Sequence, residues 1–400
     1  MKKKLRQTKI RSLVGVVIFA SGLCSVAGDQ FLRTSAQQAT KQADQSPRDV
    51  VGTWEGTLDA GSVKLKLVLH VAGEKDGSFS ATLDSPDQNA KDLPVDSVSV
   101  TDGNFRFEMK SLGAVYEGKL TKDGSRIEGQ FNQQGQAFPL IFKRTGQTAT
   151  KSLLKLQKID VEGHSLSMLI GGEGTPAVVF EAGAGTGTVS WSWVQSDVAK
   201  FARTVSYDRA GLGPSEVGPK PRSAKQIALE LHTALDKAGI KPPYVLVGHS
   251  LGGVFVRVFA GEYPKDVAGL VLIDPSQEEF DAWAATHKVS QSKDDQAQLD
   301  KAPQAVQDEV AALSTSYAQA RAAKVPPGVP VTLMTAMQDD SMPAEARKVW
   351  REKHEEWIAK VPGGKHIIVE KSGHFIQGEQ PQLVIDAIKE VVNQSQSRKQ

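Results

Sequence analysis

The chain has 400 residues, with 48 basic and 46 acidic side chains and a formal net charge of +2. The first 27 residues hold six of the basic side chains and none of the acidic ones, so the remainder has 42 against 46 and a net charge of −4. No basic block remains there, which argues against a nucleic-acid partner. Cys24 is the only cysteine, so the chain after it has no disulfide, no thiol nucleophile and no cysteine-ligated metal.

Residues 1–27 have the pattern of a secretory signal peptide. The apolar stretch Leu13–Ala20 follows a basic start, and small residues precede a cleavage position after Ala27. The basic residues are Lys2, Lys3, Lys4, Arg6, Lys9 and Arg11. We therefore expect export to the periplasm or the medium, with no stable membrane span after cleavage. An uncleaved anchor is the alternative, although a bilayer span needs about 20 apolar residues.

Residues 28–48 are rich in Gln, Ala, Ser and Thr and predict a disordered leader. Residues 49–144 then show a period of two, which predicts a small antiparallel β domain of seven or eight short strands. Asp76-Gly77, Asp102-Gly103 and Asp123-Gly124 have the composition of hairpin turns. The layout resembles a lipocalin-like sheet or barrel. We interpret this domain as a structural or docking module of unknown partner, with weak binding of an apolar ligand as the alternative.

Residues 145–154 are polar and predict a linker, and the pattern changes after them. Over 155–394, short apolar runs alternate with helical stretches, which predicts a mostly parallel sheet covered by helices. The strands are expected at Ala177–Phe180, Thr204–Tyr207, Tyr244–Val247, Leu270–Ile273 and Val331–Met334. Residues 275–326 interrupt the alternation and predict a helical lid insertion.

The pentapeptide Gly248-His249-Ser250-Leu251-Gly252 matches G-x-S-x-G. An apolar strand precedes it and a helical segment follows it, as a nucleophile elbow requires. Gly248 and Gly252 would allow close backbone approach at this turn. We therefore expect Ser250 to be a catalytic nucleophile.

A serine nucleophile needs a base and an orienting acid. His374 follows the strand-like segment 365–370 and is the expected base. Asp339 follows the strand Val331–Met334, which gives the chain order Ser, Asp, His, and is the preferred acid. Asp340, one residue later, and Asp274, at the end of the strand after the elbow helix, are the alternatives.

The oxyanion of an acyl transfer needs two backbone N–H donors. Leu251 follows the nucleophile and is the first expected donor. Ala184 lies in a glycine-rich loop after the strand Ala177–Phe180 and is the second. The same loop lacks the spacing of a dinucleotide fingerprint, so no nucleotide, other cofactor or metal is expected.

Together, Glu181-Ala182-Gly183, Tyr207–Gly211, the serine pentapeptide and Ser372-Gly373-His374 resemble the α/β-hydrolase fold superfamily, and more narrowly its bacterial esterase-like group. The resemblance covers about residues 155–394. It implies an eight-stranded, mostly parallel sheet with a lid after the sixth strand. One departure is Ala182-Gly183, where the family commonly has His-Gly.

We therefore predict an exported serine hydrolase that cleaves a small carboxylic ester through an acyl-enzyme on Ser250. The same residues would also serve an aminopeptidase, a thioesterase or a lactonase, because the fold does not select the substrate. A non-catalytic cell-envelope binding protein is the alternative from another class.

Overall fold

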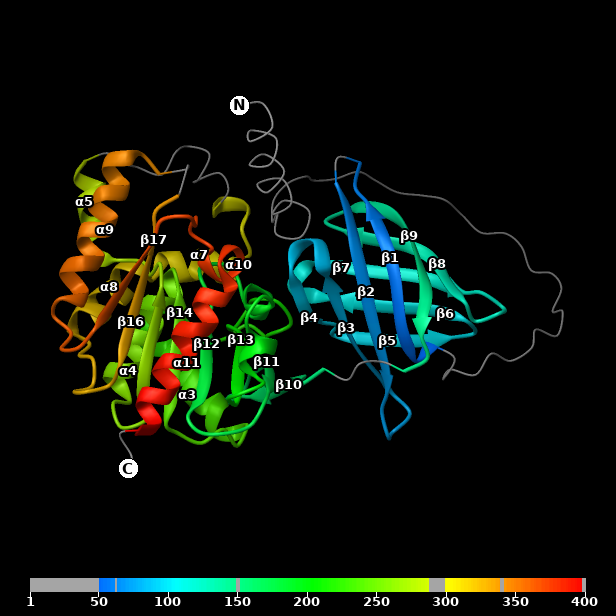
Figure 1. The fold of residues 1–400 in the computed structure, drawn as a ribbon, viewed down its shortest axis with the longest axis horizontal. Coiled ribbons are helices and arrows are strands. Elements are labelled where there is room, and N and C mark those ends of the chain that lie inside the picture. Colours follow the sequence, from blue (N-terminus) through cyan, green and yellow to red (C-terminus); the bar gives the residue numbers. More distant parts are fainter. Residues whose placement is uncertain (1–49, 62, 149–151, 288–298, 339–341, 398–400) are drawn as a thin grey trace. The chain divides into compact units, whose positions relative to one another are not determined.

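The computed structural model describes residues 50–61, 63–148, 152–287, 299–338 and 342–397. The chain divides into two compact units, one formed by residues up to 151 and one by residues from 152, except that the short segment 89–94 groups with the second although its strand belongs to the first sheet. The first is all β, and the second alternates strands and helices (Figure 1).

The first unit is a nine-stranded antiparallel sheet that curves into a half-barrel. Its strand order is β4-β3-β2-β1-β9-β8-β7-β6-β5, so each strand lies beside a neighbour in sequence except where β1 meets β9. The strands are β1 (Gly52–Asp59), β2 (Lys64–Gly73), β3 (Phe79–Ser85), β4 (Ala90–Pro94), β5 (Ser97–Thr101), β6 (Asn104–Met109), β7 (Ala114–Leu120), β8 (Arg126–Gln133) and β9 (Gln136–Gly146).

The alternating pattern sends one face of this sheet into an aromatic core. Phe107 stacks on Tyr116, with ring centroids 5.3 Å apart, and Phe142 meets Tyr116 edge to face. These rings are completely buried, as is Trp54 of β1. Side chains therefore fill the interior of the half-barrel, as expected of a structural module.

The sequence analysis expected seven or eight strands here, and the structure has nine. The two short strands β4 and β5 explain the difference. β4 contains Lys91, Asp92 and Pro94, and the valines of β5 are only half-buried. β4 therefore shows no apolar alternation, and β5 alternates but is short and only partly buried. Asp102 and Gly103, both with positive φ, form the predicted two-residue turn between β5 and β6.

The second unit contains an eight-stranded sheet in the order β10-β11-β13-β12-β14-β15-β16-β17. The first two strands pair antiparallel, β11 also runs antiparallel to β13, and the remaining strands are parallel. The strands are β10 (Leu154–Asp160), β11 (Ser165–Gly171), β12 (Ala177–Glu181), β13 (Thr204–Asp208), β14 (Tyr244–His249), β15 (Val267–Ile273), β16 (Val331–Ala336) and β17 (Lys365–Val369). The predicted architecture, an antiparallel β domain followed by a mostly parallel sheet, is confirmed.

Helices cover both faces of this sheet, because its central strands are apolar on each side. On one face, α3 (Ala224–Lys237), α4 (Leu251–Glu262) and α9 (Ala344–Ile358) pack against the strands. On the other, α2 (Gln195–Val198) and α11 (Pro381–Ser397) do so, with Trp191 from the short 3-10 helix Thr188–Trp191.

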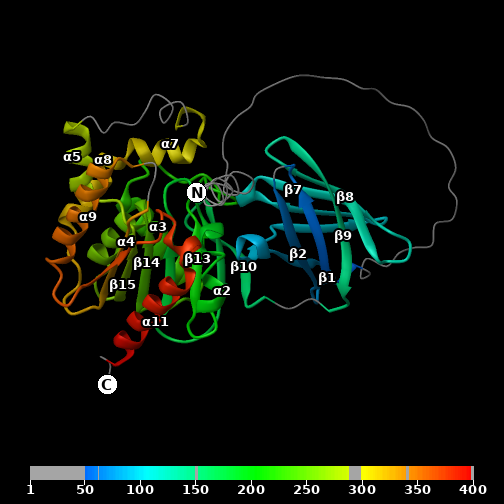
Figure 2. The same cartoon turned by 45° about the horizontal axis from the view of Figure 1, so that its top comes forward.

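Of the helices between β15 and β16, where the sequence predicted an insertion, three lie wholly within the described residues. They are α5 (Glu278–Thr286), α7 (Gln304–Ala311) and α8 (Leu313–Ala322). Figure 2 shows α7 across one end of the unit. In the part of the chain that the structure describes, no helix is both long and apolar enough to span a membrane.

Candidate active site

The serine pentapeptide forms a sharp turn between a strand and a helix. β14 ends at His249, Ser250 follows, and α4 begins at Leu251. Ser250 has φ of 53° and ψ of −124°, a conformation that costs a non-glycine residue about 1–3 kcal/mol. Hydrogen bonds hold the turn: the Ser250 N–H donates to Ile273 O, and its carbonyl accepts from Gly253 and Ser276. The local geometry is that of a nucleophile elbow.

Two glycines permit the close backbone contacts of this turn. A Cβ atom on Gly252 would lie 2.2 Å from the carbonyl oxygen of Glu181. A Cβ atom on Gly248 would lie 2.7 Å from the carbonyl oxygen of Gly252. Both carbonyl oxygens belong to the backbone, so they could make room for a Cβ atom only if β12 or α4 shifted. The glycines therefore allow α4 to start directly against the end of β12.

His374 lies in the loop between β17 and α10 (Ile376–Glu379) and is bonded to Asp274. Its Nδ1 is 2.7 Å from Asp274 Oδ2. An ionised carboxylate only accepts hydrogen bonds, so Nδ1 carries the proton, and in a neutral ring Nε2 is then the nitrogen that can take up a proton. The Asp274 side chain is 5 % exposed and the His374 side chain 33 %, so the acid is buried while the base reaches the surface.

In the described residues the carboxylate bonded to His374 is that of Asp274, one of the two alternatives to Asp339. Asp339 and Asp340 lie outside the described residues, whereas Asp274 binds the imidazole directly. Burial would raise the pKa of Asp274, but the hydrogen bond and charge of His374 lower it, with His354 and Trp350 adding to the effect. The net pKa lies below the ordinary value, so the carboxylate is ionised at neutral pH.

Trp350 and His354 of α9 and Ala336 of β16 hold the segment that carries Asp274. The Trp350 indole N–H donates to Asp274 Oδ1 at 2.8 Å, and the Ala336 backbone N–H donates to the same oxygen at 3.0 Å. His354 Nε2 lies 2.8 Å from the carbonyl oxygen of Pro275. Asp274 itself has a positive φ of 41°. These contacts hold Asp274 in a strained backbone conformation. In the sequence, the four-residue spacing of Trp350 and His354 indicates that both lie on one face of a helix, but it does not indicate that this face meets Asp274.

His249 also supports the site, although its ring does not serve as the base. Its Nε2 donates to the carbonyl oxygen of His374 at 3.0 Å, and the two rings lie 4.7 Å apart. Burial and the neighbouring His374 lower the pKa of His249 to about 3, so it is neutral at physiological pH. The residue before the nucleophile thus fixes the backbone of the base.

The two expected oxyanion donors lie in segments next to Ser250, one after it in the chain and one in the loop after β12. Leu251 is the first residue of α4, where backbone N–H groups have no acceptor within the helix. Ala184 lies in the loop 182–187 after β12, which we call the oxyanion loop. A Cβ atom on Gly183 would lie 3.2 Å from Ser250 Cβ, so this loop contacts the nucleophile. Ala184 is exposed, and Gly183 beside it is buried.

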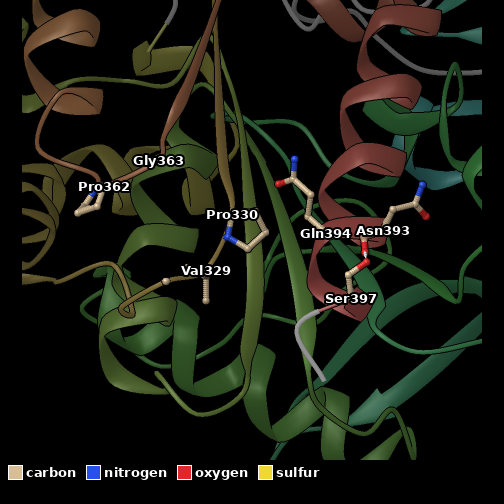
Figure 3. Close-up of a pocket in the computed structure, with 8 residues that line it drawn as sticks. Val329, Pro330, Pro362, Gly363, Asn393, Gln394 and Ser397 are labelled. Carbon is tan, nitrogen blue, oxygen red and sulfur yellow. Dashed lines mark hydrogen bonds between the residues drawn. The ribbon is translucent and has the colours of Figure 1, made fainter. Parts of the chain in front are cut away.

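A separate hollow of about 470 Å³ lies at the end of the strands opposite to Ser250 (Figure 3). Pro330, directly before β16, and Asn393 of α11 help to line it. Ser250 follows the carboxyl end of β14, and β14, β15 and β16 are parallel. The hollow is therefore at the amino end of the strands and is not part of the serine site.

Within the ranges that the structure describes, no group of three or more His, Cys, Asp or Glu side chains is arranged to hold a metal ion.

Comparison with known proteins identifies the family. The model of the "Alpha/beta hydrolase family" matches residues 178–387, and the chain belongs to this family. The YqjL protein of Bacillus subtilis (strain 168) is 39% identical over 99 residues, which is 25% of this chain and 39% of YqjL. An AB hydrolase superfamily protein of Gibberella zeae is 34% identical over 107 residues, covering 26% of this chain and 33% of that protein.

Among solved structures, the chain is similar to a thermophilic esterase from Thermogutta terrifontis. The match has a TM-score of 0.43 and 19% identity, and covers 60% of this chain and 99% of the esterase. The matched part of this chain spans only about two fifths of YqjL and one third of the Gibberella protein. The family model shows the family, and the substrates and activities of these relatives belong to those proteins.

Proposed function

We propose that this protein is a serine hydrolase that cleaves carboxylic esters through an acyl-enzyme on Ser250. The observation that carries the proposal is the His374–Asp274 hydrogen bond at the same edge of the sheet as the strained turn at Ser250. The two side chains supply an oriented base, and the elbow supplies the nucleophile. The oxyanion loop and the start of α4 supply backbone donors beside it.

In the first half-reaction, Ser250 Oγ attacks the acyl carbon and its proton passes to His374 Nε2. The carbonyl oxygen becomes an oxyanion, which the N–H groups of Leu251 and Ala184 stabilise. The intermediate collapses, the C–O bond to the alcohol breaks, and His374 returns the proton to the leaving alcohol. Asp274 keeps the imidazole in the required tautomer and stabilises its positive charge.

In the second half-reaction, water attacks the acyl-enzyme and gives a proton to His374. The second tetrahedral intermediate releases the carboxylic acid, and Ser250 Oγ regains its proton. No redox change occurs, and the ester and one water molecule are the only reactants. The substrate that fits this sequence of steps is a small-molecule ester, not a nucleic acid.

The direct test is hydrolysis of p-nitrophenyl esters, from acetate to palmitate, by the wild-type chain and by Ser250→Ala. We expect turnover in the wild type and its loss in a variant that remains folded. A Ser250→Ala variant that kept most activity would exclude the proposed nucleophile. Labelling of Ser250 by a fluorophosphonate without ester turnover would leave a serine hydrolase whose substrate is a thioester, lactone or peptide. Absence of both would favour a binding protein.

We also propose that the chain is exported. The support is the basic start, the apolar stretch Leu13–Ala20 and the small residues before Gly28, all of which lie outside the described residues. Expression of the full chain in a Gram-negative host should yield a mature protein whose amino-terminal residue is Gly28. An intact amino terminus at the membrane fraction would instead indicate an uncleaved anchor.

A further inference from the structure

Arg209 lies directly beneath the oxyanion loop, although it contacts neither Ser250 nor His374 in any hydrogen bond that the structure records. It follows the last residue of β13 and is 1 % exposed. Its Nη1 donates to the carbonyl oxygen of Ala182 at 2.8 Å, and its Nη2 donates to that of Gly183 at 2.8 Å. One guanidinium thus holds two successive carbonyls of the loop.

The remaining donors of Arg209 bind two buried carboxylates. Nη1 also donates to Glu181 Oε1 at 2.9 Å, while Nε and Nη2 donate to the two oxygens of Glu309 at 2.7 and 2.9 Å. A guanidinium has five N–H groups in a fixed planar fork, and these contacts use all five. The side chain is therefore held in one orientation, which a lysine could not reproduce.

The planarity of the peptide bond turns these carbonyl contacts into a constraint on the catalytic donor. In a trans peptide the carbonyl oxygen of one residue and the N–H of the next point in opposite directions. Because Arg209 holds the oxygen of Gly183, the N–H of Ala184 points away from the guanidinium. The same argument applies to the oxygen of Ala182 and the N–H of Gly183. The face of the loop that bears these N–H groups is thereby fixed.

Glu309 comes from α7, in the segment inserted between β15 and β16, 100 residues after Arg209 in the chain. The start of the same helix also packs near the site. A Cβ atom on Gly211 would lie 2.7 Å from Ala305 Cβ, and one on Gly185 would lie 3.3 Å from Val306. The inserted helix is thus connected to the oxyanion loop through a buried ion pair and through van der Waals contacts.

We propose that Arg209 is a positioning residue that sets the Ala184 N–H for oxyanion binding, and that Glu309 of α7 holds Arg209 in place. This inference rests on the proposed function, since it assigns a role in the same reaction. On this proposal, the inserted helix α7 helps to position the backbone of the oxyanion loop. Removal of either side chain should then weaken stabilisation of the transition state more than binding of the substrate.

The test compares Arg209→Lys and Glu309→Gln with Glu230→Gln as the control. Glu230 accepts a buried bidentate pair from Arg222 at 2.5 and 2.8 Å, and Arg222 donates otherwise to Pro219 O. The control therefore removes a comparable buried charge without disturbing a carbonyl of the oxyanion loop. For each folded variant we would measure kcat and KM on the best p-nitrophenyl ester and the unfolding midpoint.

A second readout separates positioning from general loss of stability. A trifluoromethyl ketone of matching chain length forms an oxyanion adduct with the serine, whereas the carboxylate product does not. We expect Arg209→Lys to lower kcat about 100-fold with KM changed less than about threefold. The affinity for the trifluoromethyl ketone should fall in parallel while that for the product stays constant. Glu309→Gln should show the same pattern at about tenfold, and Glu230→Gln should leave kcat within about twofold.

Variants of Arg209 and Glu309 that keep kcat within the range of the control would overturn the inference, as would losses confined to KM. If Arg209→Lys does not fold, Glu309→Gln and Glu309→Asp carry the test. If the wild type labels with fluorophosphonate but hydrolyses no ester, the rate of phosphonylation of Ser250 replaces kcat. A wild type that neither hydrolyses esters nor reacts with fluorophosphonate would refute the proposed function and this inference together. If the inference alone is wrong, the wild type is active and the Arg209 and Glu309 variants have an unchanged kcat.

Discussion

Ser250 and Asp274 occupy equivalent positions at the ends of neighbouring parallel strands. The last residues of β14 and β15, His249 and Ile273, are paired in register, and Ser250 and Asp274 each follow one residue later. Both have positive φ, 53° and 41°. Adjacent strands lie about 4.8 Å apart, so the register alone brings nucleophile and acid to one small area of the sheet edge.

The first prediction concerns the acid. Asp274→Asn should lower kcat on an ester by about 10³–10⁴-fold, because the amide cannot stabilise the imidazolium and favours the wrong tautomer. Asp339→Asn serves as the matched comparison and should change kcat less than about threefold. Steady-state kinetics with both folded variants decide the assignment. A collapse in Asp339→Asn with near-normal Asp274→Asn would return the role to Asp339.

The second prediction concerns Trp350, whose indole N–H donates to Asp274 Oδ1. Trp350→Phe keeps an aromatic ring but removes this donor, so the acid loses one hydrogen bond to its charged form. A hydrogen bond to a charged group contributes about 1.5–3 kcal/mol, and we expect kcat to fall about tenfold or more. Trp357→Phe, on the same helix and half-buried against Arg257, is the control and should change kcat less than twofold. Equal effects of the two substitutions would show that Trp350 acts only through packing.

The third prediction is a pH dependence of stability. Burial lowers the pKa of His354 to about 4 from its ordinary 6.5, although Asp274 and the carbonyl of Pro275 act in the opposite direction. Below pH 6.5 the unfolded chain takes up a proton that the folded chain accepts only near pH 4. The free energy of unfolding should therefore fall as the pH decreases from about 6.5 to about 4, by about 3 kcal/mol from this residue.

Urea unfolding at several pH values between 7 and 4.5 measures this dependence for the wild type and for His354→Gln. The variant should be less stable at pH 7 because it loses contacts with Pro275 and Thr335. Its stability should nevertheless fall less steeply on acidification, since His249 then remains as the deeply buried histidine of the site. Parallel pH profiles for the two proteins would contradict the prediction.

The fourth prediction concerns Gly252. In Gly252→Ala the added methyl would lie 2.2 Å from the Glu181 oxygen and 2.7 Å from that of Ala182. The helix and the oxyanion loop must then separate, which should cost about 1–3 kcal/mol in unfolding free energy and lower kcat about tenfold or more. Gly73→Ala, where the nearest atom is 3.5 Å away, should leave both unchanged. Normal turnover in Gly252→Ala would show that the loop adapts.

The sequence predicted the elements of the second unit well, because its strands are continuous apolar runs between helical patterns. The elbow at Ser250 and the loop of His374 were located for the same reason, since each directly follows such a run. The acid was harder to assign, because Asp274 and Asp339 both follow a strand of the same sheet. In the structure it is Asp274 that bonds to His374, 100 positions further along the chain, and no local pattern records a contact over such a separation.

Support residues were less accessible to sequence analysis. Arg209 and Glu309 are 100 positions apart, and Glu309 lies in a helix whose charged composition predicts an exposed surface. Its burial follows from pairing with the guanidinium, which is a property of the tertiary structure. Trp350 and Asp274 likewise meet across 76 positions. Long-range polar pairs of this kind leave no periodicity in the sequence.

The connection between the two units also has an evolutionary consequence. The second unit begins at β10, which is an edge strand of its sheet and pairs only with β11. Because the first strand of this sheet is an outer strand, a preceding domain can be added or removed without changing the order of the strands that follow. The β domain is thus a transferable addition in topological terms, and the same hydrolase sheet can be inherited with a different amino-terminal partner or with none.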